Sequence, residues 1–118
     1  MPGLTFGGLE VIAYATLTIS NTAVGLADGS PALVAGKVNN QLVTRALLTL
    51  ETDDVRWRAD GTAPTAGEGH KFLNGDSIIF VDARYSKLLE DIRFIRVTTD
   101  AALKITYFML QGDYIPKD

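Results

Sequence analysis

The sequence predicts an all-β fold, a single antiparallel β-sandwich or jelly-roll-like domain with an extended N-terminal arm. Short segments of alternating apolar and polar residues, typical of half-buried strands, follow one another along the chain. Clusters of Gly, Asn, Asp and Pro separate these segments, as turns separate antiparallel strands. No amphipathic segment is long enough for a helix of more than about two turns. The 118 residues suffice for one domain with one core.

The first strand is expected at residues 13–19. Residues 1–12 are interpreted as the extended arm, because they hold three glycines, a proline and few core-forming residues. The alternating sets in the strand are Tyr14, Thr16 and Thr18 against Ala15, Leu17 and Ile19. Residues 20–40 are rich in turn formers and predict a long irregular connection, with a short helical turn at 32–35.

The middle of the chain predicts three further strands. In residues 42–51, one face carries Ala46, Leu48 and Leu50, and in residues 55–59 one face carries Val55, Trp57 and Ala59. The turn between these two strands is at Asp53-Asp54. Residues 77–82 hold four consecutive apolar residues, which indicates a strand buried on both faces. One helical turn is expected at residues 85–90.

The last two strands are expected at residues 92–98 and 102–110, paired with each other across residues 99–101. The final strand is apolar on both faces: Leu103, Ile105, Tyr107 and Met109 face one way, and Lys104, Thr106, Phe108 and Leu110 face the other. Such a strand is either central in its sheet or covered by a neighbouring subunit, and both interpretations stay open. The sandwich domain is thus expected at residues 13–110, followed by a polar tail at 111–118.

The composition narrows the function classes. The apolar fraction of 47% and the charged fraction of 21% are those of an ordinary globular protein. A net charge of −3 does not supply the basic surface that phosphate binding needs, so we expect no nucleic-acid partner. No apolar stretch approaches the roughly 20 residues of a membrane-spanning helix. The N-terminus lacks the pattern of an export signal, which predicts no membrane partner and assembly in the cytoplasm.

No residue constellation in the sequence points to catalysis, so we expect neither an enzyme nor a bound cofactor. The chain has no cysteine, which removes disulfides, thiolate nucleophiles and Cys-based zinc sites. His70 is the single imidazole, and no nucleophile-elbow or phosphate-loop pattern occurs. Asp53-Asp54 is better explained as a turn than as a metal site. A calcium site built from the Asp28 and Asp60 loops is the alternative.

The loop that follows the Trp57 strand is the candidate interface. Asp60 can accept hydrogen bonds from backbone amides two residues on, Gly61 permits a positive φ, and Pro64 stiffens the far side. The arginines beside Trp57 are interpreted as an interface or ligand patch, or else as a solvated face with a structural or intersubunit salt bridge. The candidate loop and interface residues are Arg56, Arg58, Asp60, Gly61, Thr62, Pro64, Thr65, Gly69 and His70.

This Val-Arg-aromatic-Arg strand with its Asp-Gly-Thr-x-Pro-Thr loop resembles the small virion structural proteins of tailed bacteriophages. In that family the pattern is preceded by a strand ending in glutamate, here residues 46–51, and followed by a Gly-Asp turn, here Gly75-Asp76. Residues 16–26 and 94–107 are also similar, so the resemblance covers roughly residues 15–108. The loop is also similar to one in fibronectin-like accessory domains of carbohydrate-active enzymes.

The resemblance implies a capsid decoration (cement) or minor capsid protein that binds and stabilises the phage head, or a head–tail or tail component. A decoration protein of this kind implies a homotrimer bound to the major capsid protein, located in the virion and assembled in the host cytoplasm. Its arm would add a strand to, or lie along, a neighbouring subunit. The remaining alternative is a carbohydrate-binding module with a flat row of exposed aromatics, for which Tyr14, Trp57, Tyr85 and Tyr107 are the candidates.

Overall fold

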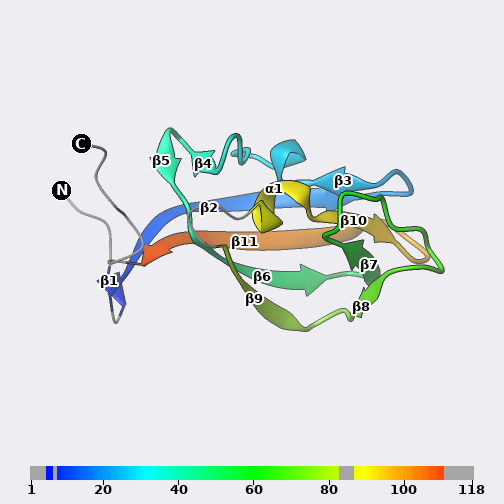
Figure 1. The fold of residues 1–118 in the computed structure, drawn as a ribbon. Helices are drawn as coiled ribbons and strands as arrows, with labels where there is room; N and C mark the ends of the chain where they lie inside the picture. Colours follow the sequence, from blue (N-terminus) through cyan, green and yellow to red (C-terminus); the bar gives the residue numbers. More distant parts are fainter. Residues whose placement is uncertain (1–4, 7, 83–86, 111–118) are drawn as a thin grey trace.

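Two antiparallel sheets pack face to face in the computed structural model, which describes residues 5–6, 8–82 and 87–110 (Figure 1). Sheet A has the order β1 (Thr5–Phe6), β2 (Leu9–Ile19), β11 (Ala101–Leu110), β6 (Arg45–Glu51) and β9 (Ser77–Val81). Sheet B has the order β3 (Val24–Gly25), β10 (Arg93–Arg96), β7 (Val55–Arg58) and β8 (His70–Phe72). The remaining elements are the hairpin of β4 (Lys37–Val38) with β5 (Gln41–Leu42), the 3₁₀ helix η1 (Leu26–Asp28) and the short helix α1 (Leu88–Asp91).

The connectivity is that of a jelly roll, which confirms the predicted fold class. Apart from the short β1, β4 and β5, eight strands follow one another along the chain. Numbered one to eight in that order, they lie as 1-8-3-6 in sheet A and as 2-7-4-5 in sheet B. Most consecutive strands therefore lie in opposite sheets, as in double-sheet jelly rolls.

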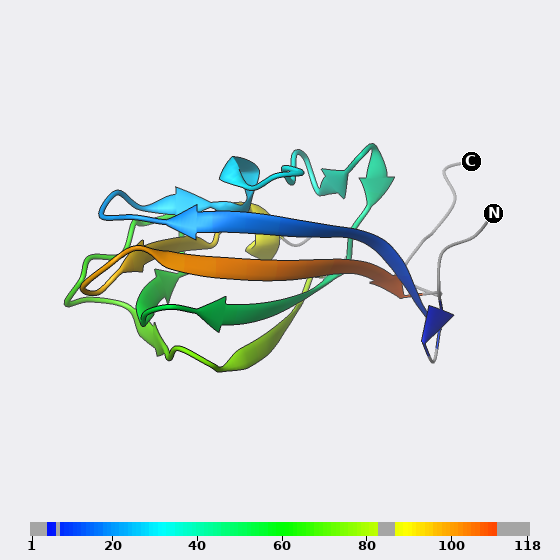
Figure 2. The same cartoon turned by 180° about the vertical axis from the view of Figure 1, so that it is seen from behind.

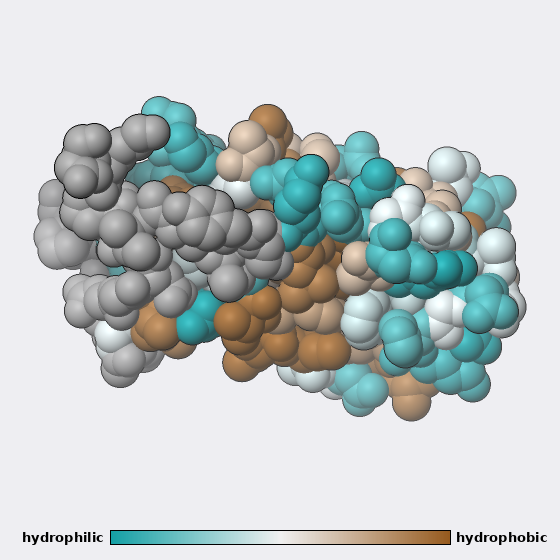
Figure 3. Space-filling model, viewed as in Figure 1, coloured by the Kyte–Doolittle hydropathy of each residue, from teal (hydrophilic) through white to brown (hydrophobic). Residues whose placement is uncertain are grey.

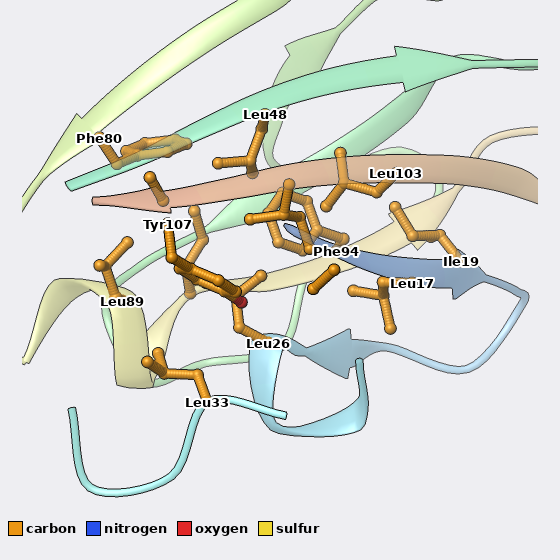
Figure 4. Close-up of a cluster of buried hydrophobic side chains, with 14 of the residues drawn as sticks. Leu17, Ile19, Leu26, Leu33, Leu48, Phe80, Leu89, Phe94, Leu103 and Tyr107 are labelled. Atoms are coloured by element: carbon orange, nitrogen blue, oxygen red, sulfur yellow. The ribbon is translucent and has the colours of Figure 1, made fainter. Parts of the chain in front are cut away.

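The core lies between the two sheets, and its side chains come from the strand faces that the alternation predicted. Figure 4 shows these side chains meeting from β2, β6, β11 and sheet B, with Leu89 of α1 and Leu26 of η1 at one side. The fully buried residues with the largest side chains are Tyr107, Phe94, Ile19, Leu26, Leu48, Leu50, Leu89, Ile92, Leu103, Ile105, Val38 and Val55. Alternation thus separated correctly the inward and outward side chains of β2, β6 and β7, whereas both faces of β11 are apolar and alternation did not indicate which one is buried.

Two predictions are wrong, one about the burial of a strand and one about the pairing of two strands. β9 is an edge strand that pairs only with β6 among the described residues, and Ile79 and Val81 are exposed rather than buried. β10 and β11 do not form a hairpin: β10 pairs with β3 and β7 in sheet B, whereas β11 pairs with β2 and β6 in sheet A. Alternation reports which face of a strand is apolar, but it carries no information about the neighbouring strand.

Several element boundaries differ from the predicted ones. β2 begins at Leu9, so residues 9–12 of the expected arm belong to sheet A, and β6 begins at Arg45 instead of residue 42. The helical turn expected at residues 32–35 is a tight backbone turn in which Val34 and Lys37 exchange hydrogen bonds. α1 begins near the end of the expected helical turn at 85–90. The tail at 111–118 lies outside the described residues.

Candidate functional site

The predicted interface loop leaves sheet B after β7 and returns as β8, and an arginine–aspartate pair fixes its first turn. Arg58 Nε donates to Asp60 Oδ1 at 3.1 Å, and Arg58 Nη2 donates to Asp60 Oδ2 at 2.5 Å. The Thr62 amide donates to Asp60 Oδ1 at 3.3 Å, as expected for a turn-forming aspartate. These bonds, the one from Arg58 foremost, lower the pKa of Asp60 to about 2 and raise the pKa of Arg58.

Arg56 holds the returning half of the loop. Its Nε donates to the carbonyl of Ala66 at 3.2 Å, and its Nη1 donates to the carbonyl of Gly69 at 2.9 Å. Thr65 and Glu68 exchange backbone hydrogen bonds of 3.0 and 3.1 Å, which close the turn between them. Arg56 therefore has a structural role within the loop. Its partners are the two backbone carbonyls, whereas a salt bridge was one of the expectations.

Gly69 marks the closest approach of the loop to the sheet. Its φ is +138°, and a Cβ atom at this position would lie 3.0 Å from the Trp57 carbonyl oxygen and 3.2 Å from Pro64 Cβ. Pro64 is buried beneath the loop. Gly61 adopts the positive φ that the Asp-Gly turn predicted, at +85°.

A hollow of about 480 Å³ opens between the two halves of the loop. The side chain of Trp57 is half-buried, with its ring centroid 4.7 Å from that of His70 and 5.0 Å from that of Phe80. The hollow is lined by Trp57, Arg58, Ala59, Asp60, Glu68, Gly69 and His70. Its walls offer an aromatic surface, a charged pair and a second carboxylate, which suits a small polar ligand or a side chain of a partner.

The structure brings most of the predicted site residues together. Arg58, Asp60, Gly69 and His70 line the hollow, whereas Arg56 and Pro64 support it from outside or below. The exposed residues Gly61, Thr62 and Thr65 lie on the loop without lining the hollow. Among the described residues, no three His, Asp or Glu side chains gather closely enough to hold a metal ion.

The outer face of sheet A is a second candidate surface, and Figure 2 shows it from the front. Neighbouring strands place two rows of side chains across it. The rows are Tyr14, Thr106, Leu47 and Ile79, and then Val11, Phe108, Arg45 and Val81. Tyr14 is 58% exposed, Ile79 62% and Val81 53%, so much of this face is apolar and open.

The sequence predicted only part of this surface. β11 lies between β2 and β6, so its apolar character agrees with a central strand. Its outward residues Thr106 and Phe108 are half-buried, and Figure 2 shows no other described element in front of β11. The contributions of Leu47 and Ile79 to this surface were missed, because both residues have apolar neighbours on each side in the sequence and no alternation marks them as outward-facing.

The outer face of sheet B differs from that of sheet A in charge. The register places Arg58 beside Arg93 and Arg56 beside Lys71, all directed away from the core. Figure 3, viewed from this side, shows hydrophilic surface over the end of the molecule that holds β7, β8 and β10, and a hydrophobic patch in the middle of the view. The two faces of the sandwich therefore present different chemistry.

Comparison with known proteins identifies no relative: no protein-family model, no curated protein and no solved structure matches this chain. Among the described residues, no helix is long and apolar enough to cross a membrane.

Proposed function

We propose that this protein is a structural component of a virion, specifically a decoration protein that binds and stabilises a phage head. The observation that carries the proposal is the apolar outer face of sheet A. The two rows extend across four strands about 4.8 Å apart and along about four residues of each strand, at about 3.4 Å per residue, so they cover roughly 260 Å². Apolar patches of about 300–600 Å² are the largest on typical monomers and often mark protein contacts.

The fold and the loop support the same proposal. Jelly rolls of eight strands are common in viral capsid domains and in lectins, although fold alone does not determine function. The loop at residues 55–70 carries the resemblance to tailed-phage virion proteins, and its bracing by Arg56 makes it a preorganised surface. The proposed partners are further copies of the chain, arranged as a homotrimer, and the major capsid protein.

The experiment is binding to heads purified from the encoding phage with this gene deleted. Leu47→Lys places a charge in the centre of the apolar face, and we expect it to weaken binding at least tenfold. Val97→Lys, at an exposed apolar residue outside sheets A and B, is the matched control and should bind as the unaltered chain does. Unchanged binding by Leu47→Lys, with the fold checked by circular dichroism, would contradict the proposal.

The same particles distinguish a head from a tail location. Antibody-gold labelling of complete virions over the whole head surface supports a decoration protein. Labelling confined to the head–tail junction or the tail supports the alternative component of that region.

Carbohydrate binding is a second candidate, favoured by the hollow beside Trp57 and by the occurrence of jelly rolls in lectins. The three described aromatic candidates do not form a flat row. Tyr107 is buried in the core, Trp57 is half-buried at the rim of sheet B, and Tyr14 lies on the outer face of sheet A. Tyr85 lies outside the described residues. A glycan array on which Trp57→Ala loses the signal would support this candidate, and an array without hits would remove it.

A further inference from the structure

We infer that β9 is the contact through which a second copy of this chain binds, by antiparallel pairing of the two β9 strands about a two-fold axis. The inference deepens the proposed function, on which it rests for its role in assembly, by naming the partner and the register. It is carried by the character of the sheet edges. Edge strands expose unpaired backbone groups, and proteins normally protect them by making them short or charged.

β9 differs from the other sheet edges. β1 covers only Leu9 and Glu10 of β2, and further along this edge Thr16 exchanges backbone hydrogen bonds with Ser30. β1 and β3 have two residues each, and β8 has three, of which His70 and Lys71 are polar. β9 has five residues, Ser-Ile-Ile-Phe-Val, without a charge, a proline or a glycine. On the side away from β6, no described residue pairs with it. An open apolar edge of this length is a template for a further strand.

The faces of sheet A determine the register of the pairing. With a two-fold axis perpendicular to the sheet, the outer faces of the two copies lie on the same side of the joined sheet. Residues directly opposite each other in an antiparallel pair point to the same face. Overlap of all five residues under this condition places Ile79 opposite Ile79 of the second copy. Ser77 then lies opposite Val81 of the second copy, and Ile78 lies opposite Phe80 of the second copy.

This register extends surfaces that are already apolar. On the outer face, the row that ends at Leu47 and Ile79 continues into the same row of the second copy, and the area covered by the joined rows grows to roughly 500 Å². On the inner side, Ile78 and Phe80 of the two copies meet at the rim of the sandwich. A two-fold contact of this kind also joins one trimer to the next.

The absence of native cysteine allows a direct test in the full chain. Ile79→Cys is treated with a short bis-maleimide at low protein concentration, and Tyr14→Cys, of similar exposure on the same face, is the control. In the proposed pairing, the two copies of residue 14 are seven strand spacings apart, about 34 Å. We expect at least tenfold more covalent dimer from Ile79→Cys. Equal cross-linking of both variants, or none with Ile79→Cys, would overturn the inference.

A second variant tests the β9 contact without chemical cross-linking. Ile79→Lys places a charge on the open edge, and we expect light scattering to show half the mass of the unaltered assembly. Thr18→Lys, exposed on the outer face of β2, should retain the full mass. A single-chain mass for the unaltered protein would reject the β9 contact, whereas failure to bind heads would reject the proposed function. The two failures are therefore distinguishable.

Discussion

Gly69 is the residue at which the candidate loop touches the sheet most closely. Its φ of +138° is strained for any residue with a side chain, and an added Cβ would meet the Trp57 carbonyl oxygen at 3.0 Å. Backbone strain of this kind costs about 1–3 kcal/mol. We therefore expect Gly69→Ala to lower the free energy of unfolding by about that amount, measured by urea denaturation.

Gly67, in the same loop, is the matched control for Gly69. A Cβ atom added to Gly67 would meet no atom within 4 Å, and the φ of this residue is outside the left-handed region. Gly67→Ala should change the free energy of unfolding by less than about 0.5 kcal/mol. Similar losses for both variants would mean that the contact with Trp57 does not determine the loop.

Two buried hydroxyls give a second prediction, because only one of them has a partner. The Tyr107 hydroxyl accepts or donates no hydrogen bond among the described residues, and burial raises the Tyr107 pKa. The Thr44 hydroxyl accepts a bond from the Leu110 amide at 3.1 Å. Tyr107→Phe should leave stability unchanged within about 1 kcal/mol, whereas Thr44→Val should cost about 1–3 kcal/mol. Chemical denaturation of both variants measures the difference, and a larger loss for Tyr107→Phe would contradict it.

At the scale of elements, one carboxylate ties the β6–β7 turn to the crossing from β10 to β11. Asp53 Oδ2 accepts bonds from the amides of Thr98 and Thr99 at 3.2 and 2.6 Å and from the Thr99 hydroxyl at 3.1 Å. These bonds, the one from the Thr99 amide foremost, lower the pKa of Asp53 in the folded chain. Its contribution to stability is therefore present above the unfolded pKa of about 3.9 and is lost as the pH falls through the folded value.

The Asp53 contact predicts a specific acid sensitivity. Asp53→Asn should be less stable than the unaltered chain at pH 6, and the difference should shrink as the pH falls below about 4, the unfolded pKa of an aspartate. Thermal melts at these pH values measure it. The exposed Asp76, whose side chain accepts no hydrogen bond among the described residues, supplies Asp76→Asn as the control. An Asp53→Asn deficit that stays constant with pH would contradict the prediction.

The elements also show what alternation can and cannot predict. Ala15 and Leu48 were grouped correctly on the apolar faces of their strands, because a side chain's face follows from the two-residue period. Leu103 lies on a strand with two apolar faces, so alternation did not indicate which of them is buried. The edge position of β9 was missed because Ile78 to Val81 are all apolar, as in a strand covered on both sides. In this chain the second apolar face is instead exposed.

The candidate site also contains features that local sequence predicts and features that depend on the tertiary fold. Asp60 and Gly61 follow local turn rules, so their conformations were predictable from neighbouring residues. The bonds from Arg56 to the carbonyls of Ala66 and Gly69 depend on how the loop folds back over sheet B, 10 and 13 residues further along the chain. The hollow beside Trp57 depends on both, so the sequence predicted Arg58, Asp60, Gly69 and His70 among its lining residues but missed Ala59, Glu68 and the shape of the hollow.

At the scale of the whole molecule, the two sheets divide contact chemistry between them. Sheet A presents apolar rows and an open edge, and sheet B presents arginines and a braced loop. A module with two different outer faces can contact two chemically different surfaces. If copies bind each other through β9, the melting temperature of the protein should depend on its concentration.

Pairing through β9 predicts a melting temperature that depends on concentration. If the folded chain is a dimer and the unfolded chain is not, each tenfold rise in concentration stabilises the dimer by about 1.4 kcal/mol. For about 236 residues this raises the melting temperature by roughly 3–5 °C. Calorimetry over a hundredfold range measures the slope, which Thr18→Lys should retain and Ile79→Lys should reduce. A slope that Ile79→Lys leaves intact would place the contact between copies elsewhere on the molecule, because mass action requires only that the folded copies bind each other.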